Sequence, residues 1–123
     1  MIHDSHFYHQ TDLSLDSQIY NIAVNIGRIG NWTLSLFDLK REKGEEMFKS
    51  RTELINKMIA QTDSYLNDLL MQKFSSKLNF TFKRFKEDFE QLKKTQINEG
   101  NYLYWAEKAL TWANILTHRA KLA

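Results

Sequence analysis

The sequence predicts an all-α protein, a four-helix bundle of the up-down type with an irregular N-terminal arm. Three observations support this fold class. The 123 residues include no proline and only four glycines, a composition that suits long helices better than turn-rich β folds. Apolar residues recur at steps of three and four along four segments, which is the period of amphipathic helices. Short polar connections between these segments predict one helical domain over residues 14–123, with residues 1–13 as the arm.

The first helix is expected to begin near Ser14 or Asp16, because either side chain can accept hydrogen bonds from the free amides of a first turn. Gly27 and Gly30 interrupt this segment. Either the helix breaks there or a neighbouring helix packs closely, and we expect the helix to continue. The predicted buried face comprises Ile19, Ile22, Ile26, Ile29, Thr33 and Leu36.

The charged stretch KREKGEE, residues 40–46, has no apolar residue and includes Gly44, so it predicts the first connection. A second helix follows, and its apolar stripe is broad enough to face a core rather than a two-stranded seam. The predicted centre of that stripe is Met47, Leu54, Met58, Tyr65 and Leu69, widened by Ile55, Ile59, Leu66 and Leu70.

The third helix is expected to start with Ser75 or Ser76 as its cap. The segment NEGN, residues 98–101, is the clearest helix-ending signal in the chain and separates the third helix from the fourth. The fourth helix has a main apolar stripe at Tyr102, Trp105, Ala109, Trp112 and Leu116.

The segment SKLNFTFKRFKEDFEQL, residues 76–92, places four phenylalanines among lysines and an arginine. At about 100° per residue, one narrow arc of a helix holds the five residues of a predicted core stripe. Phe80 projects almost opposite to that arc, near Lys83 and Arg84. The predicted core stripe is Leu78, Phe82, Phe85, Phe89 and Leu92.

Two interpretations of Phe80 follow from its position. It is either a single exposed apolar residue on a solvated face, or a contact point for a nucleic acid or a partner protein. The local charge supports the second interpretation, because seven basic and three acidic residues lie between Lys73 and Lys94. The candidate contact residues are Phe80, Lys83, Arg84, Lys94 and Lys77.

A second apolar strip lies on the last helix, on the side away from its main stripe. A helix that is apolar on two sides is often enclosed by neighbours, so the strip is either an oligomer or partner interface or part of a broad core. The candidate interface residues are Tyr104, Ile115 and Leu122, with Lys108 beside them.

Enzymatic chemistry is not expected, and no catalytic residue or cofactor is predicted. The chain has no cysteine, and no glutamate is followed three residues later by a histidine, which argues against a di-iron bundle. No glycine-rich phosphate loop occurs. His3, His6 and His9 are spaced three apart, so they are weak candidates for a metal site.

The net charge is +2, and residues 19–123 carry 17 basic and 12 acidic side chains, a mildly basic balance. We expect no signal peptide and no membrane contact, because the first residues lack an apolar run and no stretch reaches about 20 apolar residues.

Segment 77–110 is loosely similar in its spacing of apolar residues to small four-helix accessory proteins such as the ribosomal intervening-sequence bundles, and no motif in it assigns a family. The predicted function is a cytoplasmic, non-enzymatic subunit that binds nucleic acid or a nucleic-acid-processing protein. The alternative is a homo-oligomeric scaffold module without nucleic-acid contact.

Overall fold

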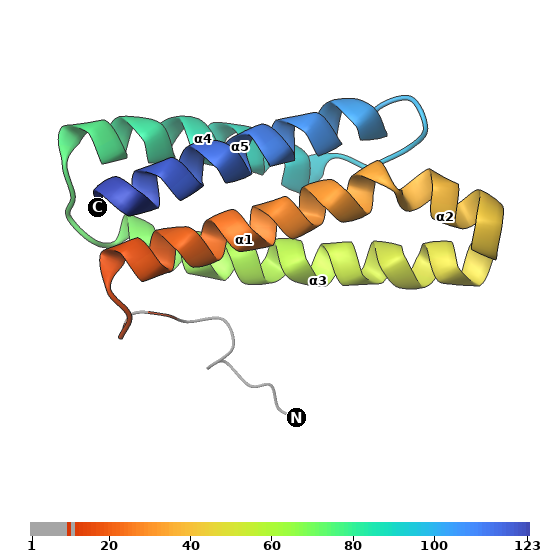
Figure 1. Ribbon diagram of the computed structural model, residues 1–123, viewed down its shortest axis with the longest axis horizontal. Coiled ribbons are helices and arrows are strands. Elements are labelled where there is room, and N and C mark those ends of the chain that lie inside the picture. Colours follow the sequence, from red (N-terminus) through yellow and green to blue (C-terminus); the bar gives the residue numbers. More distant parts are fainter. Residues whose placement is uncertain (1–9, 11) are drawn as a thin grey trace.

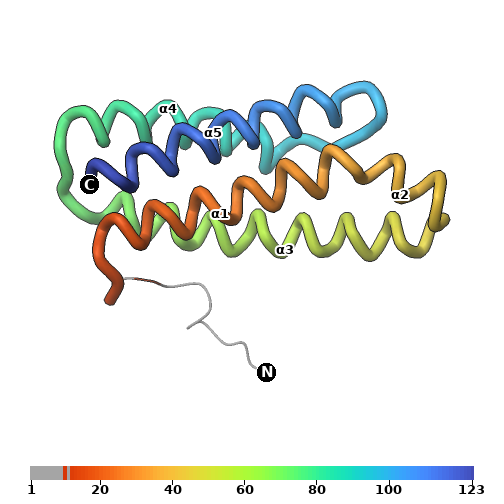
Figure 2. Tube along the Cα trace, viewed as in Figure 1, coloured from red at the N-terminus to blue at the C-terminus, as the bar shows by residue number. Residues whose placement is uncertain are grey.

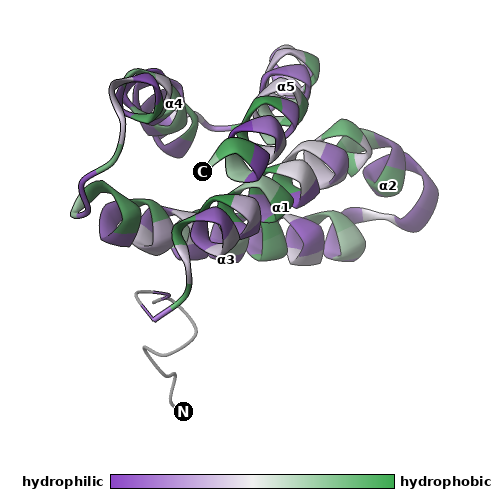
Figure 3. Ribbon diagram, turned by 60° about the vertical axis from the view of Figure 1, so that its left-hand side comes forward, coloured by the Kyte–Doolittle hydropathy of each residue, from purple (hydrophilic) through white to green (hydrophobic). Residues whose placement is uncertain are grey.

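The computed structural model describes residues 10 and 12–123, and this part of the chain is all-helical without strands. The chain reverses direction after α2, α3 and α4, and α4 and α5 lie above α1 and α3 (Figures 1 and 3), with α5 packed closely on α1. Four helices were predicted and five are found, because the first predicted helix is divided in two. The helices are α1 (Leu15–Leu34), α2 (Leu36–Lys43), α3 (Glu45–Leu70), α4 (Ser76–Lys94) and α5 (Tyr102–Leu122).

The division between α1 and α2 lies at Ser35, where the backbone has φ −95° and ψ 1°. The Ser35 hydroxyl donates to the Asn31 carbonyl at 3.2 Å, and this local bond competes with regular helix geometry. The bend is visible along the Cα trace in Figure 2. It places Phe37 between Phe48 and Tyr102, with ring centroids 5.4 and 5.2 Å away.

The predicted connection at residues 40–46 is much shorter in the structure. Residues 40–43 belong to α2 and residues 45–46 to α3, so only Gly44 separates the two helices. Its φ of +91° and ψ of −177° fall in a region that is nearly restricted to glycine. The chain therefore turns sharply at one residue, and the charged residues around it stay helical.

The predicted buried face of the first helix is confirmed, since all six residues, five on α1 and Leu36 at the start of α2, are at most 2% exposed. The expected side-chain cap is wrong. Ser14 precedes the helix in an extended conformation, but its hydroxyl makes no capping bond and lies 3.0 Å from the Ser17 hydroxyl. A hydrogen bond from Ser14 also lowers the pKa of Asp16 in the first turn.

The predicted stripe of α3 is confirmed in part: Ile55, Leu66 and Leu69 are buried, and Met58, Ile59, Tyr65 and Leu70 pack against the core. Met47 and Leu54 are 45% and 40% exposed, so they lie outside the core. The inward stripe also runs through two threonines, which interrupt the apolar pattern in the sequence. Their hydroxyls donate to carbonyls one turn earlier, Thr52 to Phe48 at 2.9 Å and Thr62 to Met58 at 2.7 Å. The residues of this stripe are Phe48, Thr52, Ile55, Ile59, Thr62, Leu66 and Leu69.

Helix α1 continues through Gly27 and Gly30, as expected, and α5 packs closely against it. A Cβ atom at Gly27 would lie 3.6 Å from the Ala113 Cβ, which is ordinary contact. At Gly30 it would lie 2.8 Å from the Leu110 Cγ, closer than carbon atoms can approach. The side chains of α5 on this side are small as well, since Ala106 and Ala109 are buried there.

Helix α4 follows its predicted limits and its predicted core stripe. The Ser75 hydroxyl accepts a hydrogen bond from the Leu78 amide at 3.3 Å and caps the helix. Phe82, Phe85 and Phe89 are at most 2% exposed, whereas Phe80 is 64% exposed.

The segment 98–101 separates α4 from α5 as predicted. Of the predicted α5 stripe, Ala109 and Leu116 are buried, and Tyr102, Trp105 and Trp112 are partly buried against the core.

A polar cluster joins the described part of the predicted arm to the bundle. Gln10 is 5% exposed, and its amide donates to the Gln18 carbonyl at 3.1 Å. Gln18 in turn donates to the Leu13 carbonyl and accepts a hydrogen bond from Gln72 at 2.6 Å. Buried amides need such partners, and this cluster connects α1 with the end of α3.

Candidate contact face on α4 and α5

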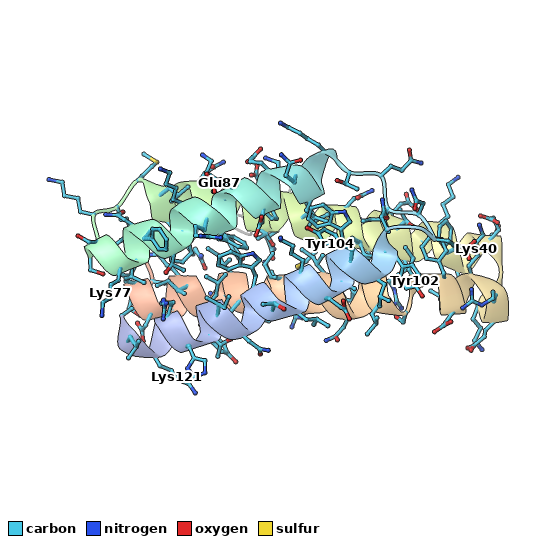
Figure 4. All side chains as sticks on the ribbon, turned by 90° about the horizontal axis from the view of Figure 1, so that it is seen from above. Lys40, Lys77, Glu87, Tyr102, Tyr104 and Lys121 are labelled. Carbon is cyan, nitrogen blue, oxygen red and sulfur yellow. The ribbon has the colours of Figure 1, made fainter. Side chains whose placement is uncertain are left out.

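The antiparallel pairing of α4 and α5 brings two separately predicted sites to the same end of the molecule. In Figure 4, Lys77 near the start of α4 and Lys121 near the end of α5 lie at that end. Phe80 is 64% exposed and Leu122 is 77% exposed. Both line one surface hollow of about 650 Å³, which we call the Phe80 hollow. Its lining consists of Ser75, Ser76, Lys77, Leu78, Phe80, Thr81, Arg119 and Leu122.

Arg119 is part of this hollow, although it was not among the predicted site residues. Its Nε donates to the Thr81 hydroxyl at 3.1 Å, and that hydroxyl donates to the Lys77 carbonyl at 3.0 Å. The guanidinium is thereby held at the boundary of α4 and α5. A sequence signal for it existed, because Arg119 lies four residues after Ile115 and three before Leu122, on the same strip of α5.

The predicted basic residues of α4 are exposed, and three of them, Lys77, Lys83 and Arg84, lie within about one turn of Phe80. The Arg84 guanidinium lies 5.8 Å from the centroid of the Phe80 ring. At about 100° per residue, Lys83 and Lys94 lie on the opposite side of Phe80 from Arg84 and Lys77. Within the described residues, none of these four cations makes an ion pair. Lys77, Lys83 and Arg84 therefore flank the exposed ring on both sides, whereas Lys94 lies about 21 Å further along the helix axis.

The acidic side chains of α4 are mostly occupied by other partners. Asp88 accepts a hydrogen bond from the Trp112 indole at 2.7 Å and lies 3.6 Å from the Lys108 ammonium. Glu90 pairs with Lys93 at 3.2 Å. Among the described residues of α4, Glu87 is the one carboxylate outside an ion pair. The outer side of α4 therefore presents an excess of uncompensated positive charge.

The predicted α5 strip is not a continuous apolar surface. Tyr104 is 56% exposed, and the Lys108 ammonium donates to its hydroxyl at 3.2 Å. This hydrogen bond, together with the charge of Asp88, raises the pKa of Lys108. Ile115 is only half-exposed, between Tyr104 near one end of α5 and Leu122 at the other. The structure brings Leu122 to the Phe80 hollow and connects Tyr104 to α4 through Lys108.

The space between the middle parts of α4 and α5 is filled by side chains. Phe85 and Trp112 pack edge to face with centroids 5.3 Å apart. The remaining void beneath Asp88 and Lys108 has a volume of only about 20 Å³. A ligand of this face must therefore lie on its surface, at the Phe80 hollow and along the outer side of α4.

The predicted histidine site at His3, His6 and His9 lies outside the described residues. Among the residues that are described, no cluster of three or more metal-ligating side chains occurs, and no helix has the length and apolarity to cross a membrane. No protein-family model matches the chain, and comparisons with curated proteins and with solved structures also gave no match.

Proposed function

We propose that this protein is a non-enzymatic helical subunit of a cytoplasmic complex and that its α4–α5 face binds single-stranded nucleic acid. The observation that carries the proposal is Phe80, which is 64% exposed while the other phenylalanines of α4 are buried. Lys77, Lys83 and Arg84 flank this ring and make no ion pair with any described residue. Proteins that bind single strands without strong sequence preference combine these two features, a basic surface and an aromatic platform.

The basic side chains would supply the affinity for phosphates. Lys77, Lys83, Arg84 and Lys94 are exposed and outside the ion pairs of the described chain. Each phosphate neutralised on a single strand contributes about −0.7 to the slope of log K against log salt. Four such contacts predict a slope of about −3. Arg119 at the Phe80 hollow can extend this surface onto α5.

The ring of Phe80 would supply a stacking contact for one base. Arg84 lies over the ring at 5.8 Å, and a base can stack on the remaining exposed part. Stacking of a base on an aromatic side chain contributes about 1–3 kcal/mol, or about five- to 150-fold in affinity. Phe80→Ala should therefore weaken binding by that factor and leave the fold unchanged, because the side chain is mostly outside the core.

The deciding experiment is fluorescence anisotropy with a labelled oligonucleotide of mixed pyrimidines, titrated at several salt concentrations. The test variant is the double charge reversal Lys83→Glu with Arg84→Glu. The matched control is Arg28→Glu with Lys57→Glu, which changes the net charge equally at exposed positions on α1 and α3. We expect the test variant to lose binding and its salt dependence, and the control to bind nearly as the natural chain does.

Two results would reject nucleic-acid binding. One is an unchanged isotherm for the Lys83/Arg84 variant. The other is an equal loss in both double variants, since this would indicate attraction by net charge alone and no defined face. Circular dichroism of both variants confirms that any loss does not result from unfolding.

The second candidate function is a homo-oligomeric scaffold that uses the end of α5. It is favoured by Leu122, which is 77% exposed and lies beside the exposed Phe80 in one hollow. Leu122→Asp is the informative change, because Ile115 is half-buried and its replacement would disturb the fold. Light scattering should show a concentration-dependent mass for the natural chain and a monomer for Leu122→Asp. A single monomeric mass for both proteins at all concentrations would reject this function.

A further inference from the structure

A second hollow lies beside the junction of α1 and α2, away from the Phe80 hollow. The α1–α2 junction and the α4–α5 connection lie at the same end of the molecule (Figure 1). Between them, α3 on one side and the end of α4 with residues 95–97 on the other enclose a space of about 300 Å³. This volume is at the lower limit of typical small-molecule pockets. We call it the Thr33 hollow, because Thr33 of α1 lies in its wall.

The Thr33 side chain is buried but has no hydrogen-bond partner. It is 2% exposed, and within the described residues its hydroxyl takes part in no hydrogen bond. Thr52 and Thr95 line the same space, and their hydroxyls differ in this respect. They donate to the carbonyls of Phe48 and Gln91 at 2.9 and 2.6 Å. A buried hydroxyl without a partner is energetically unfavourable, so Thr33 is a group that a ligand can satisfy.

The rest of the wall is mainly apolar and carries no free charge. Leu36, Ile55 and Leu92 are buried residues that contribute apolar surface to the hollow. Lys93 lies at the edge, but its ammonium is 2.8 Å from Asp63 and 3.2 Å from Glu90. A ligand carboxylate would have to compete with these two carboxylates, so the hollow favours a neutral molecule.

We propose that the Thr33 hollow binds a small neutral molecule with an apolar body and one hydroxyl or carbonyl group, which forms a hydrogen bond with Thr33. The apolar body replaces water against the buried side chains, and the polar group satisfies the one unpartnered hydroxyl in the wall. Small-molecule sites are usually apolar cavities that contain a small number of precisely placed polar groups. This site does not depend on the proposed nucleic-acid face.

The test uses p-cresol as the neutral probe with a hydroxyl, toluene as the probe without it, and 4-methylbenzoate as the anionic probe. Each is titrated into the ¹⁵N-labelled full chain and followed by amide chemical shifts. We expect saturable shifts from p-cresol at residues that line the hollow and weak or no shifts from 4-methylbenzoate. Thr33→Val keeps the side-chain shape and should weaken p-cresol about three- to tenfold, while toluene binds it as it binds the natural chain.

A second pair of variants tests the location without altering the core. Asn56 is exposed at the edge of the hollow, so Asn56→Trp should block entry and abolish the p-cresol shifts. Asn67→Trp is the matched control, because Asn67 is an exposed asparagine on the same helix outside the hollow. The proposal is overturned if p-cresol gives no saturable shifts in the natural chain, if Asn56→Trp binds it unchanged, or if a folded Thr33→Val binds it unchanged.

Discussion

The close contact between α1 and α5 makes a direct prediction for two glycines three residues apart. Both lie inside α1, and neither has a positive φ, so replacement by alanine carries no backbone strain. They differ only in the space beside them. At Gly27 an added Cβ would meet the Ala113 Cβ at 3.6 Å, whereas at Gly30 it would meet the Leu110 Cγ at 2.8 Å and the Ala106 carbonyl at 3.2 Å.

The expected changes in the free energy of unfolding have opposite signs. Gly27→Ala should stabilise the protein by about 0.4–1 kcal/mol, because alanine restricts the unfolded chain and fits without strain. Gly30→Ala gains the same term, but carbon atoms need about 3.5 Å, so Leu110 or the helix axes must move by about 0.7 Å. Overpacking of this kind costs about 1–3 kcal/mol, which leaves a net destabilisation of about 1 kcal/mol.

The assay is urea unfolding followed by circular dichroism at 222 nm, with the slope m compared between variants. We expect Gly30→Ala to lower the unfolding midpoint and Gly27→Ala to raise it, with a difference of about 1.5–2 kcal/mol between them. Leu110→Ala should relieve part of the clash, so a double-mutant cycle with Gly30→Ala should give a favourable coupling of about 1 kcal/mol. A Gly30→Ala protein that is as stable as Gly27→Ala would refute the close packing of α1 on α5.

Three further predictions concern the helix ends and one ion pair. Gly44→Ala should destabilise the protein by about 1–3 kcal/mol in urea unfolding, because the φ of Gly44 is +91°. The cost comes from the backbone alone, since no atom lies within 4 Å of the added Cβ. An unchanged unfolding midpoint would contradict this backbone conformation. Ser75→Ala should cost about 1 kcal/mol in the same assay by removing the cap on the Leu78 amide, and Ser75→Asp should restore it. Asp63, with Glu90, raises the pKa of Lys93 above 10.5 in the folded protein. The stabilisation from this ion pair is therefore lost as the pH rises through the raised pKa of Lys93, so Lys93→Met should reduce the alkaline decline in melting temperature.

The sequence patterns that predicted the structure correctly are those with a single consistent period. In α4, the three inward phenylalanines and the outward Phe80 follow directly from the helical angle. In α3, Thr62 occupies a core position and Thr52 a partly buried one because their hydroxyls bond to the preceding turn, and a search for apolar residues passes over them. The bend at Ser35 is also hidden, since a serine in a helix and a serine that bends it look alike in sequence.

The candidate site was predictable residue by residue but not as an assembly. The exposure of Phe80 follows from the period of α4, and that of Leu122 from the second strip of α5. Their meeting in one hollow depends on which helices are neighbours, and the period of a single helix does not contain that information. The position of Arg119 on the second strip of α5 was also readable from the sequence, but its contact with Thr81 was not, because that contact crosses from α5 to α4.

Both hollows have a common origin in the way α4 is attached to the bundle. Glycine and alanine allow α1 and α5 to approach each other closely around Gly27 and Gly30. Helix α4 is instead attached through phenylalanine rings, with Phe82, Phe85 and Phe89 forming a row of centroids 6.3 and 5.6 Å apart. Large side chains increase the distance between helix axes, and shorter side chains at the ends of the row cannot fill that distance. The Phe80 hollow lies at one end of α4 and the Thr33 hollow at the other, each beyond the row of three buried rings, none of which lines either space.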